Sequence, residues 1–268
     1  MTQRQPHTVG SLAADLRRLG LTDGDVVIVH SSVRAIGFVA GMAQAVVQAL
    51  IDVVGAEAGA GAGGTVVVPT HTSFNSDPAG WRNPPVPAEW WPVIREQSPG
   101  FDPRRTPSWW VGVLPEIVRS WPGALRSSHP EVSFAALGAK AAEVVADHRL
   151  DDGLGEASPL GAIYRERGKV LLIGCGHDRN TSLHLAEFRQ PNPPLTEFGA
   201  AVRRPDGSAR WITWIAPDTD TSDFSEIGKA FEATGAVSIG PVGDAEARLM
   251  PQAGLVDFAT EWMRTHRR

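Results

Sequence analysis

The sequence predicts an α/β protein with a mainly parallel central sheet flanked by helices, an added antiparallel section toward the carboxyl end, and a long insertion rich in proline and tryptophan. Three observations support this fold class. Short β-branched runs alternate with longer segments of helical period, which is typical of βαβ units. Each of these runs leads into a polar turn. Beyond residue 194 the pattern changes to two short segments around a Pro-Asp-Gly turn, which predicts a hairpin.

The first elements are a helix, a buried strand and a second helix. Residues 8–20 carry leucines at helical spacing, with Thr8 as the expected N-cap. Residues 26–29 are a continuous run of valine and isoleucine, which is typical of a strand buried on both faces. Residues 39–54 follow as an apolar helix. Residues 55–64 then form a connector rich in glycine and alanine.

A second buried strand, residues 65–68, completes a parallel βαβ unit and ends in the polar turn 69–72. Residues 73–110 interrupt this rhythm and hold five of the nine tryptophans. A linker would not carry so many aromatic side chains, so we expect this excursion to be a lid or a pocket wall. We expect residues 1–268 as a whole to form a single α/β domain.

The rest of the chain continues the alternation, and no internal repeat emerges. The further expected helices are residues 112–120, 140–148, 157–167, 181–189, 224–233 and 255–266. A third buried strand is expected at residues 170–173, before the glycine-flanked Cys175. The hairpin pairs residues 200–203 with residues 210–216.

Composition excludes several classes of protein. The 25 Lys and Arg against 30 Asp and Glu give a net charge of −5, and the basic residues are scattered, so we expect no nucleic-acid partner. An acidic surface suits cationic partners. The single cysteine, Cys175, excludes an intramolecular disulfide, which makes the cytoplasm the default location. No apolar window reaches the roughly 18 residues of a membrane helix, so no membrane association is expected. Oligomeric state is not predicted.

Histidines concentrate in the polar turns. Five of the eight lie in or beside loops next to buried runs: His30, His71, His129, His177 and His184. Ligands of open α/β sheets bind at the carboxyl ends of the strands, so His30, His71 and His177 stand where a site is expected. The alternative is that polar residues simply tend to follow strands.

The densest group of polar side chains is residues 176–187. If Thr181 caps the following helix, His184 and Glu187 lie on one helical face, three residues apart. A carboxylate beside an imidazole fixes its tautomer and raises its basicity, as a general base requires. The alternative is an ordinary surface pair. A zinc site is disfavoured because the second helical histidine of the zincin pattern is missing, so no metal is expected.

Residues 30–32, His-Ser-Ser, offer backbone N–H groups and hydroxyls at a helix entrance, where a phosphate or an oxyanion is stabilised. The chain lacks a P-loop, the dinucleotide-binding glycine pattern and a Gly-x-Ser-x-Gly elbow. Cys175 is better explained by packing than as a nucleophile. Asp218 and Asp220 are expected to be solvated loop carboxylates unless the fold brings them to His184.

Five stretches, in order and at suitable spacing, together resemble the aminoglycoside 3-N-acetyltransferase family. They are residues 29–32 (VHSS), 68–72 (VPTHT), 101–107 (FDPRRTP), 129–138 (HPEVSFAALG) and 174–187 (GCGHDRNTSLHLAE), with a weaker match at 223–229. The resemblance implies acetyl-CoA as donor and the 3-amino group of a 2-deoxystreptamine antibiotic as acceptor, with direct transfer that confers resistance. It also implies a fold distinct from that of the smaller acetyltransferases with a conserved pyrophosphate loop.

Carried over by position, the resemblance makes His184 the general base, oriented by Glu187 and Asp218. It further implies a set of residues along the CoA channel: His30, Ser31, Ser32, Val33, Thr70, His71, Thr72, Thr106, Pro107, Ser108, His129, Ser133 and Phe134. A polycationic aminoglycoside would be attracted to an acidic cleft. The expected acids of that cleft are Asp178, Asp220, Asp223 and Glu226.

Three other functions stay open on the sequence alone. An N-acyltransferase could act on another amine in biosynthesis. The histidine-rich loops could belong to a metal-dependent hydrolase. A non-enzymatic protein that binds small cations would bind an aminoglycoside without releasing a thiol from acetyl-CoA.

Overall fold

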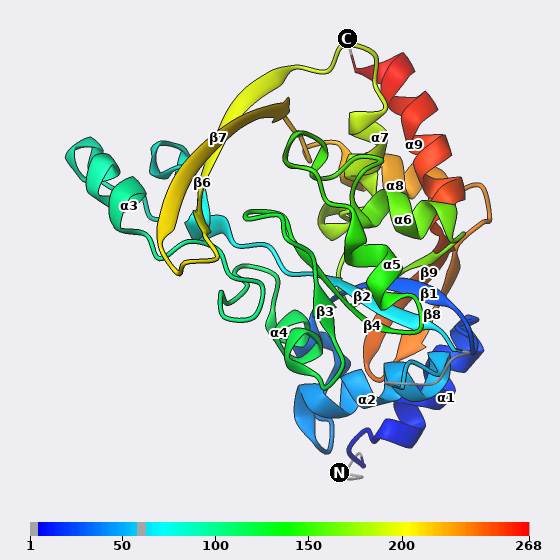
Figure 1. Cartoon of the computed structure of the whole chain (residues 1–268). Helices are drawn as coiled ribbons and strands as arrows, with labels where there is room; N and C mark the ends of the chain where they lie inside the picture. Colours follow the sequence, from blue (N-terminus) through cyan, green and yellow to red (C-terminus); the bar gives the residue numbers. More distant parts are fainter. Residues whose placement is uncertain (1–4, 58–62, 268) are drawn as a thin grey trace.

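A seven-stranded sheet lies between two layers of helices in the computed structural model, which describes residues 5–57 and 63–267 (Figure 1). The expected connector 55–64 therefore falls partly outside the described residues. The strand order is β3-β4-β2-β1-β5-β9-β8. The strands are β1 (Val26–Ser31), β2 (Thr65–Pro69), β3 (Leu125–Arg126), β4 (Phe134–Gly138), β5 (Lys169–Ile173), β8 (Ser238–Val242) and β9 (Ala245–Pro251).

The centre of the sheet is parallel, as the sequence predicts. Strand β1 pairs in parallel with β2 and with β5, so the three predicted buried strands are neighbours. Strands β4 and β9 pair antiparallel to this centre, and the edge strands β3 and β8 pair antiparallel to them in turn. Five of the seven strands described in this sheet therefore run in one direction, which confirms the fold class.

Helices cover both faces of the sheet. The α-helices are α1 (Val9–Leu19), α2 (Met42–Val54), α3 (Trp91–Gln97), α4 (Val113–Ser120), α5 (Ala141–Ala146), α6 (Pro159–Arg165), α7 (Leu183–Phe188), α8 (Phe224–Glu232) and α9 (Gln252–His266). The short 3-10 helices are η1 (Val33–Ile36), η2 (Ser73–Asn75), η3 (Pro78–Gly80), η4 (Ala88–Trp90), η5 (Leu150–Asp152) and η6 (His177–Arg179). Of the described helices, none is both long and apolar enough to cross a membrane.

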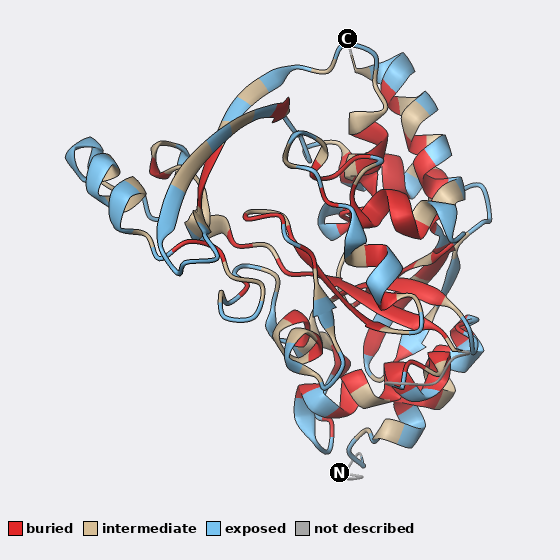
Figure 2. Ribbon diagram, in the orientation of Figure 1, coloured by how far each residue is buried: buried red, intermediate tan, exposed pale blue. Residues whose placement is uncertain are grey.

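Two apolar cores sit on opposite faces of the sheet, and β1 contributes to both. Val27 and Val29 pack with α1, α2 and α4, whereas Val26 and Ile28 pack with the layer of α5 to α9. This alternation follows from the period of two residues in a strand. Buried residues accordingly concentrate along the sheet and on the helix sides that face it (Figure 2).

The hairpin forms a separate two-stranded sheet. Strands β6 (Leu195–Arg203) and β7 (Ala209–Pro217) pair over their full length and arch away from the main body (Figure 1). Both strands are longer than predicted, because their outer residues are polar or exposed and give little apolar signal.

The excursion 73–110 packs on the outer side of this hairpin. The Phe101 N–H donates to the Ala201 carbonyl at 2.8 Å, and α3 lies beyond the two strands (Figure 1). Arg95 on α3 pairs with Asp77 at 2.7 Å. The middle of the excursion therefore braces the hairpin, and only its two ends return toward the main sheet.

The sequence analysis places His177 at the edge of the sheet where a ligand is expected, but in the structure His177 holds other elements together. Its ring is 4% exposed, and Nε2 lies 3.1 Å from the Glu232 carboxylate on α8. Arg248 on β9 binds the same Glu232 oxygen at 2.5 Å. The ring packs directly on Gly228, where an added Cβ would stand 2.0 Å from the ring Cγ. His177 therefore fixes η6 to α8 and β9.

This contact predicts opposite effects for two helical glycines. We expect Gly228→Ala to lower the free energy of unfolding by ~1–3 kcal/mol, because the methyl group overlaps the His177 ring. Gly254→Ala on α9 is the control, since its Cβ would find its nearest atoms at 3.6 and 3.7 Å. We expect it to raise stability by ~0.5–1 kcal/mol through helix propensity. Urea unfolding measures both, and equal gains would contradict the contact.

Candidate active site

A cavity of about 760 Å³ opens at the carboxyl ends of β1, β2 and β5. The sequence prediction that their polar turns meet at one edge is confirmed. The polar or reactive side chains along the cavity are His30, Ser31, Ser32, Arg34, His71, Ser73, Cys175, Asp178, Arg179, Asn180, Thr181 and His184. Its volume lies within the roughly 300–1,000 Å³ of small-molecule sites.

His184 and Glu187 form a close, mostly buried pair on α7. His184 Nδ1 lies 2.6 Å from Glu187 Oε2, and the two side chains are 13% and 4% exposed. The predicted pair is confirmed, and the alternative of a surface pair is wrong. Since Nδ1–H donates to the carboxylate, Nε2 keeps its lone pair and has no protein partner among the described residues. The expected helix cap at Thr181 is wrong, because Ser182 occupies that position.

The second oxygen of Glu187 is held from two further elements. Oε1 accepts a hydrogen bond from the Asp220 backbone N–H at 2.9 Å and lies 2.5 Å from Arg267 Nη1, at the end of α9. Arg267 also binds the Asp223 carboxylate through Nη2 at 2.6 Å, and this pairing raises the pKa of Arg267. Arg267 therefore stays charged and neutralises the buried Glu187. Sequence reasoning missed it because its partners lie dozens of residues away.

Asp218 does not reach His184 in the structure. Its side chain is exposed, and its Oδ1 accepts a hydrogen bond from the neighbouring Thr219 N–H at 3.0 Å. The contact expected from Asp218 is made two residues later by the backbone of Asp220. The backbone explains why Asp220 makes this contact. The Asp218 N–H donates to the Pro194 carbonyl, so Asp218 still belongs to the pairing of β6 with β7, and the loop that reaches Glu187 begins after it.

His30 and His71 stand beside His184 as neutral rings. Their Nε2 atoms are sealed from solvent without a partner, although both rings line the cavity. Burial, with a smaller contribution from the nearby His184, lowers both pKa values to about 3. An unpaired lone pair is cheaper to bury than an unpaired N–H, so the proton of each neutral ring belongs on Nδ1.

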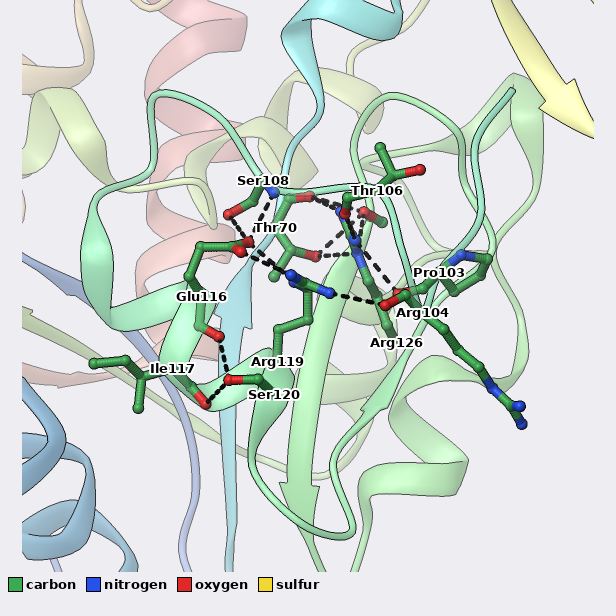
Figure 3. Close-up of polar contacts among 11 residues, drawn as sticks. Thr70, Pro103, Arg104, Thr106, Ser108, Glu116, Ile117, Arg119, Ser120 and Arg126 are labelled. Atoms are coloured by element: carbon green, nitrogen blue, oxygen red, sulfur yellow. Dashed lines mark hydrogen bonds and ion pairs between the residues drawn. The ribbon is translucent and has the colours of Figure 1, made fainter. Parts of the chain in front are cut away.

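Several residues expected along the CoA channel are instead bound to Arg126 (Figure 3). Arg126 Nε lies 3.0 Å from Thr70 Oγ1 and 3.1 Å from Ser133 Oγ, and its Nη1 donates to the Thr106 carbonyl. The Thr72 hydroxyl donates to the Pro130 carbonyl at 2.5 Å. These hydroxyls satisfy a buried guanidinium and a buried loop, so none of them faces the cavity.

Glu116, at the start of α4, fixes the turn that contains Ser108 through hydrogen bonds and an ion pair (Figure 3). Ser108 donates to it from its backbone N–H at 2.7 Å and its hydroxyl at 2.6 Å, and Arg119 pairs with it at 2.7 Å. Burial raises the pKa of Glu116, but these hydrogen bonds outweigh it and bring the pKa to about 2. Ser108 and the adjacent Pro107 therefore do not line the cavity.

His129 and Phe134 are structural as well. His129 Nδ1 accepts the N–H groups of Glu131 and Val132 at 3.2 and 3.1 Å. Phe134 is fully buried and meets the His71 ring edge-to-face at 5.5 Å. Of the residues expected along the CoA channel, those that line the cavity are His30, Ser31, Ser32, Val33 and His71.

The expected acids are spread over different surroundings. Asp178 lines the cavity and pairs with Arg179 at 3.1 Å. Asp223 is bound to Arg267, whereas Asp220 and Glu226 are exposed. Of the four expected acids, Asp178 is therefore the one that lines the cavity.

The end of the 73–110 excursion and the start of α4 form another wall of the cavity. Trp109, Trp110 and Val113 line it and remain exposed. Trp110 has a φ of 64°, which is rare for a bulky residue and typical of ligand-binding turns. The clustering of tryptophans at the end of the excursion was the available signal.

Cys175 lines the cavity, and burial raises its pKa to about 11, so it remains a protonated thiol at neutral pH. Across residues 5–57 and 63–267, no cluster of three or more His, Cys, Asp or Glu side chains is arranged to hold a metal ion.

The family described as aminoglycoside 3-N-acetyltransferase matches residues 28–264. The chain belongs to this family, which makes it an acyltransferase.

Similarity to individual members extends over almost the whole chain. The SPbeta prophage-derived aminoglycoside N(3')-acetyltransferase-like protein YokD of Bacillus subtilis (strain 168) is 42% identical over 96% of this chain and 92% of its own length. Aminoglycoside N(3)-acetyltransferase IX of Micromonospora chalcea is 35% identical over 96% of this chain and 94% of its own. The YokD crystal structure has a TM-score of 0.91 over 97% of this chain and 100% of that one. The structure of AAC-IIIb with CoASH has 35% identity and a TM-score of 0.84 over 97% of each chain.

Four buried neutral histidines predict loss of stability in mild acid. The pKa values of His30, His71 and His129 are lowered to about 3 and that of His148 to about 4, chiefly by burial. Below pH 6.5 these four histidines bind protons in the unfolded chain but not in the folded chain. The free energy of unfolding therefore falls by ~1.4 kcal/mol per pH unit for each histidine, down to the folded pKa.

One group opposes this trend. Burial raises the pKa of Glu131 to about 7, so Glu131 stabilises the folded state as the pH falls from 7 to 4.5. Four histidines outweigh one glutamate, and we expect a net loss of several kcal/mol between pH 7 and pH 5. Urea titrations at pH 7, 6 and 5 measure it. A constant free energy of unfolding across that range would show that these rings are not buried neutral.

Proposed function

We propose that this chain transfers the acetyl group of acetyl-CoA directly to the 3-amino group of the 2-deoxystreptamine ring of aminoglycosides, and so confers resistance. The observation that carries the proposal is the pair of His184 and Glu187, whose free Nε2 stands at the edge of the 760 Å³ cavity in a chain of this family. Relatives named for this reaction support it, as does the family structure with CoASH.

His184 is the general base in this proposal. Aminoglycoside amines are mostly protonated at neutral pH, and only a neutral amine attacks a thioester. His184 Nε2 takes the proton of the attacking nitrogen, and Glu187 stabilises the imidazolium that forms. As the N–C bond forms, the C–S bond breaks, and the proton passes from His184 to the departing sulfur of CoA. Cys175 takes no part, since its thiol is protonated.

His30 and His71 supply the second requirement, hydrogen-bond donors for the thioester oxygen. Both rings are neutral at physiological pH and line the same cavity as His184. Donors fixed in place before reaction stabilise the negative charge that develops on the oxygen. Ser31, Ser32 and Val33 then contact the bound acetyl-CoA, and Asp178 faces the cationic acceptor.

We propose further that the chain acts as a single domain in the cytoplasm, where acetyl-CoA is available. The test of the proposed function is acetyl-CoA consumption with gentamicin, kanamycin, neomycin, apramycin and a set of unrelated amines, followed by location of the acetylated nitrogen. Acetylation of unrelated amines alone would indicate a biosynthetic N-acyltransferase. Aminoglycoside binding without thiol release would indicate a binding protein.

His184→Ala separates binding from chemistry. We expect turnover to fall by at least ~100-fold, the usual contribution of a general base, while the Kd for CoA stays nearly unchanged. The control is His266→Ala, because His266 is exposed at the end of α9. Near-normal acetylation by the His184 variant would overturn the assignment of the base.

Arg267→Gln tests whether the ion pair behind Glu187 positions the base. We expect kcat to fall by ~10- to 100-fold, a part of the general-base contribution, with little change in KM for acetyl-CoA. Arg267→Lys should recover part of kcat, because it restores the charge. Arg264→Gln is the matched control, since Arg264 forms an exposed pair with Glu261 on the same helix. Equal kcat in both Gln variants would remove Arg267 from the positioning role.

A further inference from the structure

A second, smaller pocket lies between the hairpin and the main body. Its volume is about 110 Å³, and it shares no lining residue with the larger cavity. Glu131 and Val132 form one side, Leu150 and Gly153 the floor next to η5, and strands β6 and β7 provide the far wall. The candidate residues from the sequence include only one member of this lining, His129.

Glu131 is the unusual group in this pocket. Glu131 is partly exposed at the pocket, and its carboxylate has no hydrogen bond or ion pair in the described part of the chain. The surrounding protein raises its pKa to about 7 by desolvation. The backbone fixes its position: its N–H donates to His129 Nδ1 at 3.2 Å, and its carbonyl accepts from the Thr72 N–H at 2.8 Å. The fold therefore does not need the carboxylate, and an unpaired acid in apolar surroundings costs stability.

Aromatic rings line the same pocket as this carboxylate. Trp214 on β7 stacks on Phe198 on β6 with ring centroids 6.0 Å apart, and the His129 ring meets Trp214 edge-to-face at 5.4 Å. Phe188 completes the wall. Aromatic faces attract alkylammonium groups, and a carboxylate beside them adds a charge-assisted hydrogen bond. His129 is neutral, because burial lowers its pKa to about 3, so it does not repel a cation.

The pocket lies next to the proposed catalytic pair. Phe188 follows His184 by four residues on α7, so the two side chains are neighbours on one helical face, one turn apart. Thr219 also lines the pocket, and the next residue, Asp220, binds Glu187 through its backbone N–H. A molecule whose one amine meets His184 therefore has a second group within reach of Glu131.

We infer that the pocket of Glu131, Phe188, Phe198 and Trp214 binds a primary ammonium group on a short alkyl arm of the acceptor, an amine other than the one acetylated. The volume of 110 Å³ equals roughly four water molecules, which suits an aminomethyl group and excludes a whole drug-sized ligand. This inference rests on the proposed function for the identity of the acceptor. It makes Glu131 a determinant of which acceptors bind.

The test compares two acceptors that differ in one group. Neomycin carries an aminomethyl group where paromomycin carries a hydroxymethyl group. Binding calorimetry in the presence of CoA gives the Kd of each for the wild type and for Glu131→Gln. We expect the variant to bind neomycin at least tenfold more weakly and to bind paromomycin within threefold of the wild type, because only neomycin loses a charged partner.

Glu96→Gln is the matched control, since it removes one exposed acid from α3 and changes the net charge equally. We expect it to change neither Kd by more than twofold. Ala216→Leu, which fills the pocket from β7, is a second variant that should weaken neomycin binding and keeps the test decisive if Glu131→Gln does not fold.

Two results would overturn the inference: unchanged neomycin binding by Glu131→Gln, or an equal loss for both acceptors. Absence of neomycin binding by the wild type would overturn it as well. Turnover is measured separately. Wild-type protein that binds neomycin through Glu131 but releases no CoA would refute the proposed function and leave the pocket assignment standing.

Discussion

The buried carboxylate of Glu187 is the constraint on which the rest of the site depends. A charge that is 4% exposed must be paired, and Glu187 is paired on both oxygens: Oε2 with His184, Oε1 with Arg267 and the Asp220 N–H. These partners come from α7, from the end of α9 and from the loop after β7. One carboxylate therefore holds together three elements that are distant in sequence. The orientation of the His184 ring is the consequence that matters for chemistry, because Nε2 is left as the free nitrogen.

The surroundings of each histidine decide its chemical role. His30, His71 and His184 line the same cavity, but only His184 has a carboxylate partner. A carboxylate stabilises the protonated ring, so it suits a base that must accept a proton during the reaction. Burial without such a partner keeps His30 and His71 neutral, which suits donors that must not exchange protons. Desolvation and pairing thereby give three identical side chains two different environments, and the proposed roles rest on that difference.

The parts predicted from the sequence are those specified by local pattern. Continuous apolar runs mark the three central strands, and a spacing of three residues on a helix pairs His184 with Glu187. The missed parts depend on contacts across the fold. Arg126 and Arg267 act through partners that no spacing reveals, and the loop after β7 presents Asp220 where Asp218 was expected. Strand β9 alternates buried and exposed residues only in part, with charges at Glu246 and Arg248, so its apolar signal is weak.

The net charge of −5 can be interpreted more closely once the surroundings of each acid are known. Asp223 is neutralised by Arg267 and Asp178 by Arg179, while Glu226 faces water. Exposed and paired charges contribute little to specific binding, because solvent and counter-charges screen them. Glu131 is only partly exposed and has no counter-charge among the described residues, and aromatic rings lower the polarity of its pocket. A single unpaired carboxylate in such surroundings attracts a cation more strongly than several solvated ones, since the Coulomb energy grows as the effective dielectric constant falls. Recognition of a polycation therefore depends on where one acid is desolvated, and the total charge of the chain does not reveal that position.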